Sequence, residues 1–127
     1  MRLVPIAVVV NGVEETPKDW SEIESELVFK GEFQDGLYRI NEFDRLWIVF
    51  GFHKSRGLRL KVRPRKAMDD TKVGIFASRG TQRPNRLGLT LVHLVEAKRG
   101  VLVVRGLDAF DGSPVFDVKP LDLDYDR

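Results

Sequence analysis

Apolar residues recur along the chain in two patterns, strict alternation and short continuous runs, and both predict β-strands. Residues 22–29 alternate, so that a glutamate-rich face lies opposite a face made by Ile23, Ser25, Leu27 and Phe29. Residues 2–10, which are rich in β-branched side chains, and residues 46–53 are almost continuously apolar, a pattern typical of buried strands. Ser21–Glu24 imitates a helix capping box, but the alternation favours a strand.

Residues 58–63 form a second alternating segment, and its two faces differ in charge. Leu58, Leu60 and Val62 are predicted to face the core. The opposite face is then a row of three cations spaced about 6.6 Å apart, formed by Arg59, Lys61 and Arg63. Residues 64–72 follow as an irregular linker within the domain.

The second half of the chain supplies the remaining strands. Residues 87–96 and 101–107 are apolar segments joined by a turn at 98–100, and a last short strand covers 115–119. In the first half, Leu37, Ile40 and Phe43 at three-residue spacing allow one or two helical turns. Seven or eight short strands with at most one brief helix predict an all-β fold, a small closed or nearly closed antiparallel β-barrel.

Composition narrows the class of protein. At 127 residues, 1–127 are expected to form a single domain. The absence of cysteine excludes disulfides and thiolate metal sites and suits a reducing compartment. His53 and His93 lie far apart without an acidic partner motif, so we expect no metal. No apolar run approaches the ~20 residues of a membrane span, and we expect a cytoplasmic protein.

Charge is segregated along the chain, although the net charge is only +2. Residues 54–86 carry eleven Lys and Arg against two Asp, a balance of +9, and the rest carries ten against seventeen, a balance of −7. This favours an anionic partner for the middle third, with nucleic acid the leading candidate. A basic face that is merely solvated is the alternative.

Polar residues that can bind a ligand cluster where strands are predicted to end. The richest cluster is the loop from Gly74 to Gly88, which holds three arginines, an asparagine and a proline between two apolar segments. Asn11-Gly12, His53 and the segment 108–114 are the others. Each also has a plain structural interpretation, as a turn or as a histidine that satisfies a backbone carbonyl. Trp20 and Trp47 are assigned to packing.

Five ordered sequence blocks are similar to those of a known family. They are Leu46–His53, Val62–Arg65, Gly74–Arg79, Arg83-Pro84-Asn85 with Gly88, and Asp111–Val115 with Asp117–Pro120. Through them residues 3–121 resemble the TsaA-like family, whose characterised members are TrmO-type tRNA adenosine N-methyltransferases that use S-adenosylmethionine. The resemblance implies a small β-barrel, a homodimer, and methylation of the exocyclic amine of a modified adenosine beside the tRNA anticodon. The chain also lacks the Gly-x-Gly-x-x-Gly fingerprint of Rossmann-type cofactor folds.

The resemblance also implies site residues. The positions that match the family's cofactor site are Asn11, Gly12, Val13, His53, Lys54, Arg79, Leu89, Asp108, Ala109, Phe110 and Asp111. Asp117, Lys119 and Asn85 are our candidates for orienting the amine and accepting its hydrogens. Substrate phosphates are expected on Arg59, Lys61, Arg63, Arg65, Arg83 and Arg86.

The chain departs from the family pattern at two places. Arg86-Leu87 stands where members commonly have Pro-Ile, and Leu121 stands where they commonly have tyrosine. These departures affect the expected tRNA substrate more than the expected cofactor. A non-catalytic RNA-binding barrel and a small-molecule methyltransferase therefore stay open as alternatives.

Overall fold

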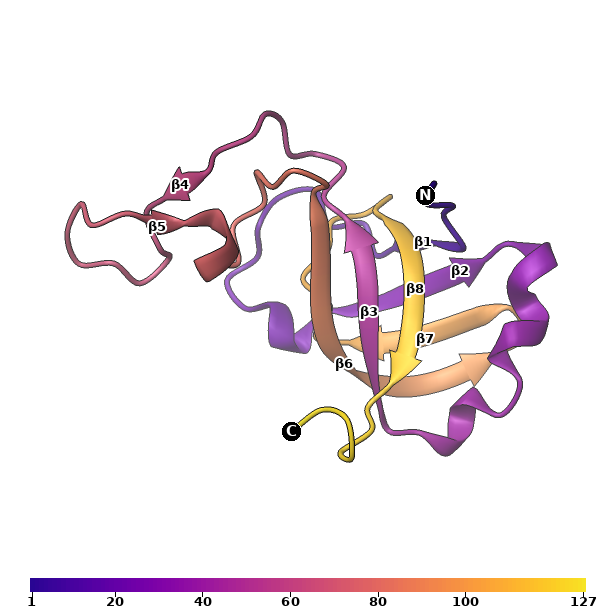
Figure 1. Ribbon diagram of the computed structural model, residues 1–127. Helices are drawn as coiled ribbons and strands as arrows, with labels where there is room; N and C mark the ends of the chain where they lie inside the picture. Colours follow the sequence, from indigo (N-terminus) through magenta and orange to yellow (C-terminus); the bar gives the residue numbers. More distant parts are fainter.

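The computed structural model describes residues 1–127, and six of its eight strands close into an antiparallel barrel (Figure 1). The barrel strands are β1 (Ala7–Val10), β2 (Glu24–Phe29), β3 (Arg45–Gly51), β6 (Leu87–Lys98), β7 (Val101–Arg105) and β8 (Pro114–Pro120). Their order around the barrel is β1-β2-β7-β6-β3-β8, and every pairing is antiparallel. The predicted closed antiparallel barrel is confirmed.

The barrel closes because its longest strand bends. The first half of β6 pairs with β3 and its second half pairs with β7, with a register shift between Leu94 and Glu96. A second shift, between Val49 and Phe50, lies where β3 pairs with β8. Such bulges increase the local twist and turn a strand from one neighbour to the next.

Alternate strand residues fill the barrel interior. Ser25, Leu27 and Phe29 of β2 are buried, as their alternation predicts. Leu27 and Phe29 belong, with Leu46, Ile48 and Phe50 of β3, to a cluster of 13 buried apolar residues. Burying one large apolar side chain contributes about 1.5–3 kcal/mol, so this cluster is the main source of stability.

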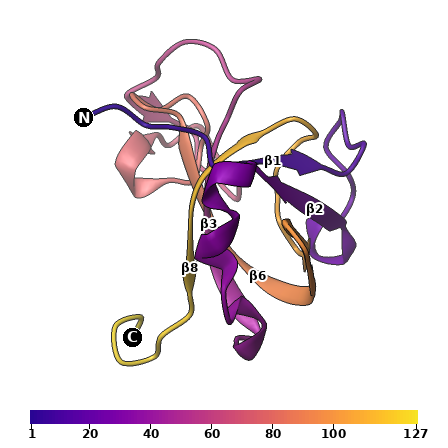
Figure 2. The same ribbon diagram turned by 90° about the vertical axis from the view of Figure 1, so that its right-hand side faces the viewer.

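Helical structure is limited to four short 3-10 segments: η1 (Trp20–Glu22), η2 (Gly31–Leu37), η3 (Ile40–Glu42) and η4 (Ile75–Ala77). η2 and η3 supply the helical turns expected around residues 37–43 and lie together beside one end of the barrel (Figure 2). η1 is a single turn whose cap is Asp19, which accepts the N–H of Ser21. No helix is long and apolar enough to cross a membrane.

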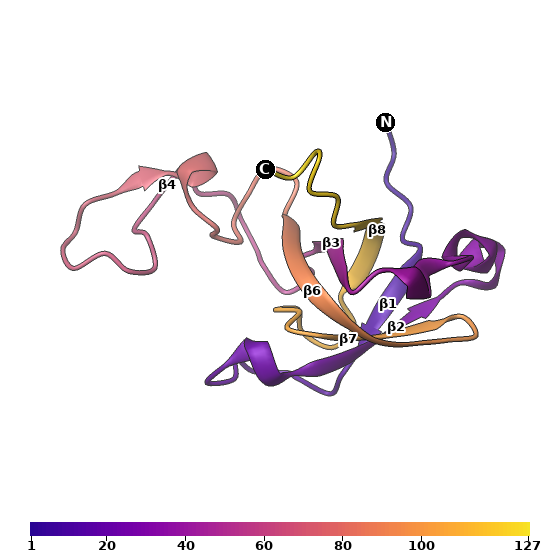
Figure 3. The ribbon, with the colours of Figure 1, turned by 90° about the horizontal axis from the view of Figure 1, so that it is seen from below.

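The prediction that residues 58–63 form a strand facing the core is wrong. Only β4 (Lys61–Val62) is extended, and it pairs with β5 (Val73–Gly74) in a separate two-stranded sheet. This sheet belongs to an arm, residues 55–86, that projects from the barrel (Figures 1 and 3). Leu58 and Leu60 are 53% and 61% exposed. Both edges of β3 are occupied, by β6 and β8, so the segment has no barrel edge to join.

Four other predicted strands are longer than the observed ones. β2 begins at Glu24 instead of residue 22, because Glu22 belongs to the turn η1. β1 begins at Ala7 instead of residue 2, β3 ends at Gly51 instead of residue 53, and β7 ends at Arg105 instead of residue 107. Pro5 has no N–H to donate to a hydrogen-bond ladder between strands, which helps to explain why β1 does not extend towards the N-terminus. Nor is β1 covered on both faces, because Val8 and Val10 are exposed.

Candidate functional site at the barrel mouth

Three segments far apart in the sequence meet at one mouth of the barrel. They are the turn after β1 (residues 11–14), the end of β3 (52–54), and the loop between β7 and β8 (106–113). Backbone hydrogen bonds join the first to the third: Asp111 donates to the carbonyl of Val13 and Gly112 to that of Val9, both at 2.8 Å. These polar strand ends, which the sequence singles out separately, therefore converge.

Asp111 holds the turn after β1 in place. Its Oδ1 accepts the backbone N–H groups of Asn11 at 2.9 Å and Gly12 at 3.0 Å. Gly12 has φ +70°, a left-handed conformation that favours glycine. The two N–H groups lower the pKa of Asp111 because they stabilise the ionised carboxylate, and the nearby Lys54 and His53 add a smaller electrostatic effect. Oδ2 has no hydrogen-bond partner and remains available to a ligand.

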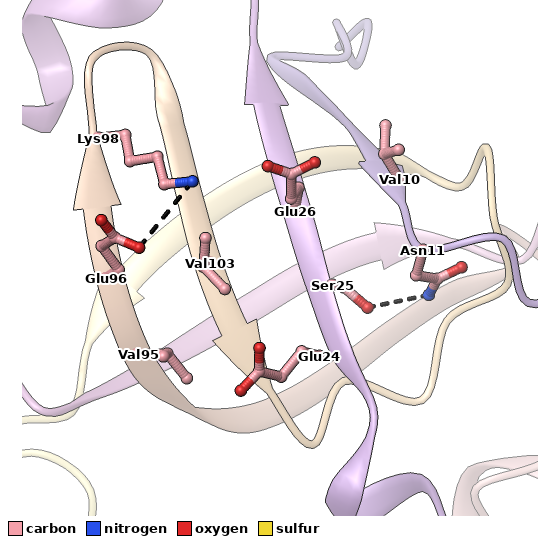
Figure 4. A pocket seen from close by; sticks show the side chains of 9 residues that line it. All are labelled: Val10, Asn11, Glu24, Ser25, Glu26, Val95, Glu96, Lys98 and Val103. Atoms are coloured by element: carbon pink, nitrogen blue, oxygen red, sulfur yellow. Dashed lines mark hydrogen bonds and ion pairs between the residues drawn. The ribbon is translucent and has the colours of Figure 1, made fainter.

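The side chain of Asn11 is fully used within the protein. Its Nδ2 donates to Ser25 Oγ at 2.9 Å (Figure 4). The same nitrogen donates to the carbonyl of Ala109 at 3.0 Å. Its Oδ1 accepts the N–H of Val13 at 2.9 Å. The Asn11 amide thus ties β1 to β2 and to the loop before β8, which favours the structural interpretation of this side chain.

Hydrogen bonding fixes the tautomer of His53. Ser113, which is buried, has one hydroxyl hydrogen, and it donates that hydrogen to the carbonyl of Phe110 at 2.7 Å. The hydroxyl oxygen therefore accepts from Nδ1–H of His53 at 3.2 Å. In the neutral ring this leaves Nε2 as an acceptor, on the side that faces Gly112.

Lys54 bridges two sides of the mouth. Its Nζ donates to the Glu14 carboxylate at 2.7 Å and to the Glu14 carbonyl at 3.0 Å. The same nitrogen lies 4.8 Å from the centroid of the Phe110 ring, a cation–π geometry. Trp20 packs edge-on against Phe110, with ring centroids 5.6 Å apart. The packing role predicted for Trp20 is confirmed.

A second polar cluster lies at the start of β6. Arg79, from the arm, donates through Nη2 to the carbonyl of Leu89. Thr90 Oγ1 donates to the carboxylate of Asp108. Three predicted cofactor residues, Arg79, Leu89 and Asp108, are thereby tied to one short stretch of β6.

Two of the three predicted catalytic residues lie on the outer face of β8. Asp117 pairs in register with Val49 and Lys119 with Trp47. Their charged groups form an ion pair at 3.4 Å, and both side chains are at least half exposed. Asp117 Oδ1 also accepts the N–H of Val118 at 2.9 Å. No hydrogen bond or ion pair joins this pair to the segments at the mouth.

Asn85 lies beside the mouth, in the turn where the arm returns to β6. The N–H of Phe52 donates to the carbonyl of the adjacent Arg86 at 2.9 Å. Arg86 has φ +48°, and its guanidinium donates to the carbonyl of Ser55 at 3.1 Å. Proline cannot adopt a positive φ. The turn at Arg86 therefore differs from the Pro-Asn-Pro turn that is common in the TsaA-like family.

The cations of the arm divide into two groups. Arg83 donates to two carbonyls of its own loop and lies 5.9 Å from the Phe76 ring, and Arg63 donates to the carbonyl of Ala67. The side chains of Arg56, Arg59, Lys61, Arg65, Lys66 and Lys72 form no hydrogen bond or ion pair. The second group is free to meet an anionic partner.

The outer face of β2, β6 and β7 has the opposite charge. An open hollow of about 470 Å³ lies there, with Glu24, Glu26 and Glu96 along it (Figure 4). Its one cation, Lys98, lies 3.9 Å from Glu96. This face would repel a polyanion, whereas the arm carries an excess of positive charge.

A small closed antiparallel barrel with polar loops gathered at one mouth defines a ligand-binding barrel, distinct from the parallel sheets of Rossmann-type enzymes. The chain belongs to the family of the tRNA-methyltransferase O N-terminal domain, whose family model matches residues 9–127. The resemblance stated from the sequence blocks is thereby confirmed.

Three named proteins are similar to this chain, and the matched region makes up a different fraction of each. A tRNA (adenine(37)-N6)-methyltransferase of Mus musculus is 40% identical over 95 residues, which cover 73% of this chain and 22% of the mouse protein. An S-adenosyl-L-methionine-binding protein of Archaeoglobus fulgidus is 34% identical and covers 99% of this chain and 93% of its own length. A crystal structure of TrmO from Pseudomonas aeruginosa has a TM-score of 0.77 and 26% identity, with 99% of this chain and 58% of that chain covered.

Sequence reasoning missed Glu14 and Thr90, and it included Ser113 only as part of the polar segment 108–114, without a role of its own. Glu14 carries no signal, because it stands in a polar loop beside another glutamate. Thr90 is hidden in an apolar strand, and Ser113 resembles an ordinary turn residue. All three act through partners that are distant in sequence, namely Lys54, Asp108 and His53.

Proposed function

We propose that the chain binds S-adenosylmethionine at the barrel mouth and methylates the exocyclic amine of a modified adenosine beside the anticodon of a tRNA. The observation that carries the proposal is the convergence of residues 11–13, 53–54 and 108–111 at one mouth. These are the positions at which the family resemblance places the cofactor. The names of the mouse and archaeal relatives support the activity and the cofactor respectively.

The groups at the mouth fit the chemistry of this cofactor. Asp111 Oδ2 and His53 Nε2 are acceptors for ribose hydroxyls or for an ammonium group. Gly12 is exposed, and its backbone can meet an adenine edge. Lys54 and Arg79 supply positive charge for a carboxylate, although Arg79 already donates one Nη2 hydrogen bond to Leu89.

Bound S-adenosylmethionine supplies an electrophilic methyl group on a sulfonium. The protein then has to orient the target amine and accept its hydrogens, which does not require a strong base. Of the three predicted catalytic residues, Asn85 is the one connected to the mouth. The next residue, Arg86, accepts a backbone hydrogen bond from Phe52 at the end of β3. Asp117 and Lys119 lie farther along β8 and stay candidates for contact with the substrate.

The arm is proposed to bind the tRNA backbone. Arg59, Lys61 and Arg65 have no partner within the protein, and the arm projects beyond the barrel where a large ligand can reach it (Figure 3). Arg63, Arg83 and Arg86 are also proposed contacts, but each would first have to release a backbone carbonyl. The homodimer, the cytoplasmic location and the single domain spanning 1–127 likewise remain proposals.

A protein that binds the cofactor without modifying tRNA is the second candidate. It is favoured by the archaeal relative, which matches almost the full length of this chain and is named only for cofactor binding. Methyl turnover on RNA separates this candidate from the proposed function.

The test is incubation with labelled S-adenosylmethionine and total tRNA, followed by nucleoside analysis, with calorimetry of cofactor binding in parallel. We expect label in an N6-methylated adenosine derivative. Cofactor at a hundred times its dissociation constant should stabilise the fold by about 2.7 kcal/mol. Binding without RNA labelling would support the second candidate, and absence of binding at millimolar cofactor would overturn both. Arg79→Ala should weaken binding, and unchanged affinity would remove Arg79 from the cofactor site.

A further inference from the structure

Lys54 is held from two directions at the barrel mouth. Glu14 accepts two hydrogen bonds from Nζ, one with its carboxylate at 2.7 Å and one with its carbonyl at 3.0 Å. The Phe110 ring lies under the same nitrogen at 4.8 Å. Trp20 packs edge-on against that ring and restricts its movement. A lysine side chain, ordinarily free to rotate, is thus given one position.

An ammonium group has three N–H donors. Glu14 accepts two of them, and no hydrogen-bond acceptor of the protein takes the third, although the Phe110 ring lies on one side of the nitrogen. The Lys54 side chain is 37% exposed, so a ligand at the mouth can reach it. The other cation placed near the mouth by sequence, Arg79, has Nη2 directed to the carbonyl of Leu89. Lys54 is therefore the better placed cation for an anionic group of a ligand.

We propose that Glu14 is a positioning residue that aims the third N–H of Lys54 at the carboxylate of a ligand carrying an amino-acid group. This inference rests on the proposed function, in which the ligand is S-adenosylmethionine. The cost of fixing a long side chain is then met in the free protein, so the charged hydrogen bond contributes more fully to binding. Glu14 acts through geometry, because its negative charge by itself would repel the ligand carboxylate.

The test compares two ligands that differ only in the carboxylate: S-adenosylhomocysteine and its decarboxylated analogue, which keeps the ammonium group. Calorimetry gives the ratio of their dissociation constants in each variant. For the wild type we expect the intact ligand to bind about tenfold or more tightly than the analogue, as for a charged hydrogen bond. Lys54→Met should bring that ratio close to one.

Glu14→Ala should reduce the ratio about threefold or more while leaving the affinity for the decarboxylated analogue unchanged. Glu14→Gln keeps a hydrogen-bond acceptor and should retain most of the ratio. Glu15→Ala is the matched control, since Glu15 is exposed and its side chain forms no hydrogen bond or ion pair. Melting curves check that each variant is folded.

The outcomes separate this inference from the proposed function. If the ratio of the two dissociation constants is unchanged in Glu14→Ala, Glu14 does not position Lys54. A larger ratio would mean that Glu14 acts only as a charge that repels the ligand carboxylate. Either result would overturn the positioning role. Equal binding of both ligands by the wild type would overturn carboxylate recognition and leave the proposed function standing. Failure of the wild type to bind either ligand would overturn both.

Discussion

Gly88 lies against the ring of Phe50 so closely that a Cβ on residue 88 would sit 2.6 Å from Cζ of the ring. The two residues are paired in register across β3 and β6, and Phe50 is 1% exposed. The ring also packs edge-on against Phe52, with centroids 5.3 Å apart, so it cannot withdraw freely. The Phe50 ring can therefore fill this end of the barrel only because residue 88 is glycine.

Gly88→Ala is expected to lower the free energy of unfolding by about 1–3 kcal/mol, because overpacking forces the ring out of its position. Urea denaturation measures the change. Gly31→Ala is the matched control, since nothing lies within 4 Å of a Cβ there and its φ is ordinary. In a Phe50→Leu background the cost of Gly88→Ala should shrink. An equal cost in both backgrounds would show that the ring is not responsible.

The depressed pKa of Asp111 predicts a pH-dependent contribution to stability. A carboxyl whose pKa is lowered by folding stabilises the protein above its unfolded value, ordinarily 3.8, and this stability is lost as pH falls through the folded pKa. Asp111→Asn keeps the shape and removes the charge. The difference in unfolding free energy between wild type and variant should be constant above about pH 5 and shrink below about pH 4.

Urea denaturation from neutral to acid pH measures that difference. Glu15→Gln, at an exposed position without contacts, should show no such trend. A difference for Asp111→Asn that stays constant, or widens, towards acid pH would mean that its ionised form does not hold the turn after β1.

Replacing Arg59, Lys61 and Arg63 together with Gln should weaken tRNA binding and its dependence on salt. Single-stranded contacts give a slope of about −0.7 per neutralised phosphate on a log–log plot, so three lost contacts flatten it by about two units. Filter binding across a salt series measures the slope. The variant should fold normally, because these side chains lie on the exposed arm.

The matched control removes three cations outside the arm, Lys18, Lys30 and Arg99, which are also exposed. It should leave the slope nearly unchanged. Equal flattening by both triple variants would show that net charge, and not the arm, governs RNA binding. An unchanged slope in the arm variant would leave Arg65, Arg83 and Arg86 as the contacts.

Asp117→Asn is predicted to reduce methyl turnover while cofactor affinity stays near normal, the pattern of an interaction made mainly in the transition state. Single-turnover rates and calorimetry measure the two quantities. Asn85→Ala serves as the comparison at the mouth. Full activity of Asp117→Asn would restrict this carboxylate to its ion pair with Lys119 and its hydrogen bond to Val118. Equal loss of cofactor affinity would make it a ligand-binding residue.

Sequence patterns predicted the barrel because alternation reports which face of a strand is buried. This worked for β2, whose Ser25, Leu27 and Phe29 point inward. It failed for Leu58 and Leu60, which alternate equally well but have no barrel edge to join. Periodicity describes one segment, whereas burial depends on which neighbours that segment finds.

Sequence analysis could find the site residues whose own side chain suggests ligand binding. It could not find those whose role depends on contact with a second residue. His53, Asp108 and Asp111 were singled out as polar residues at strand ends. Glu14 and Thr90 were not, because their importance lies in partners far away in sequence, Lys54 and Asp108. Only the closure of the barrel brings these pairs together.

The ladder between β3 and β6 ends at the hydrogen bond from Phe52 to Arg86, so everything between them is an enlarged hairpin loop. The arm is therefore an insertion whose two ends are neighbours in space. Its sequence can change, or its length be altered, without changing the register of any barrel strand. Such a connection separates two tasks: the arm can diverge in sequence while the turn after β1, the end of β3 and the loop between β7 and β8 keep their places on the barrel.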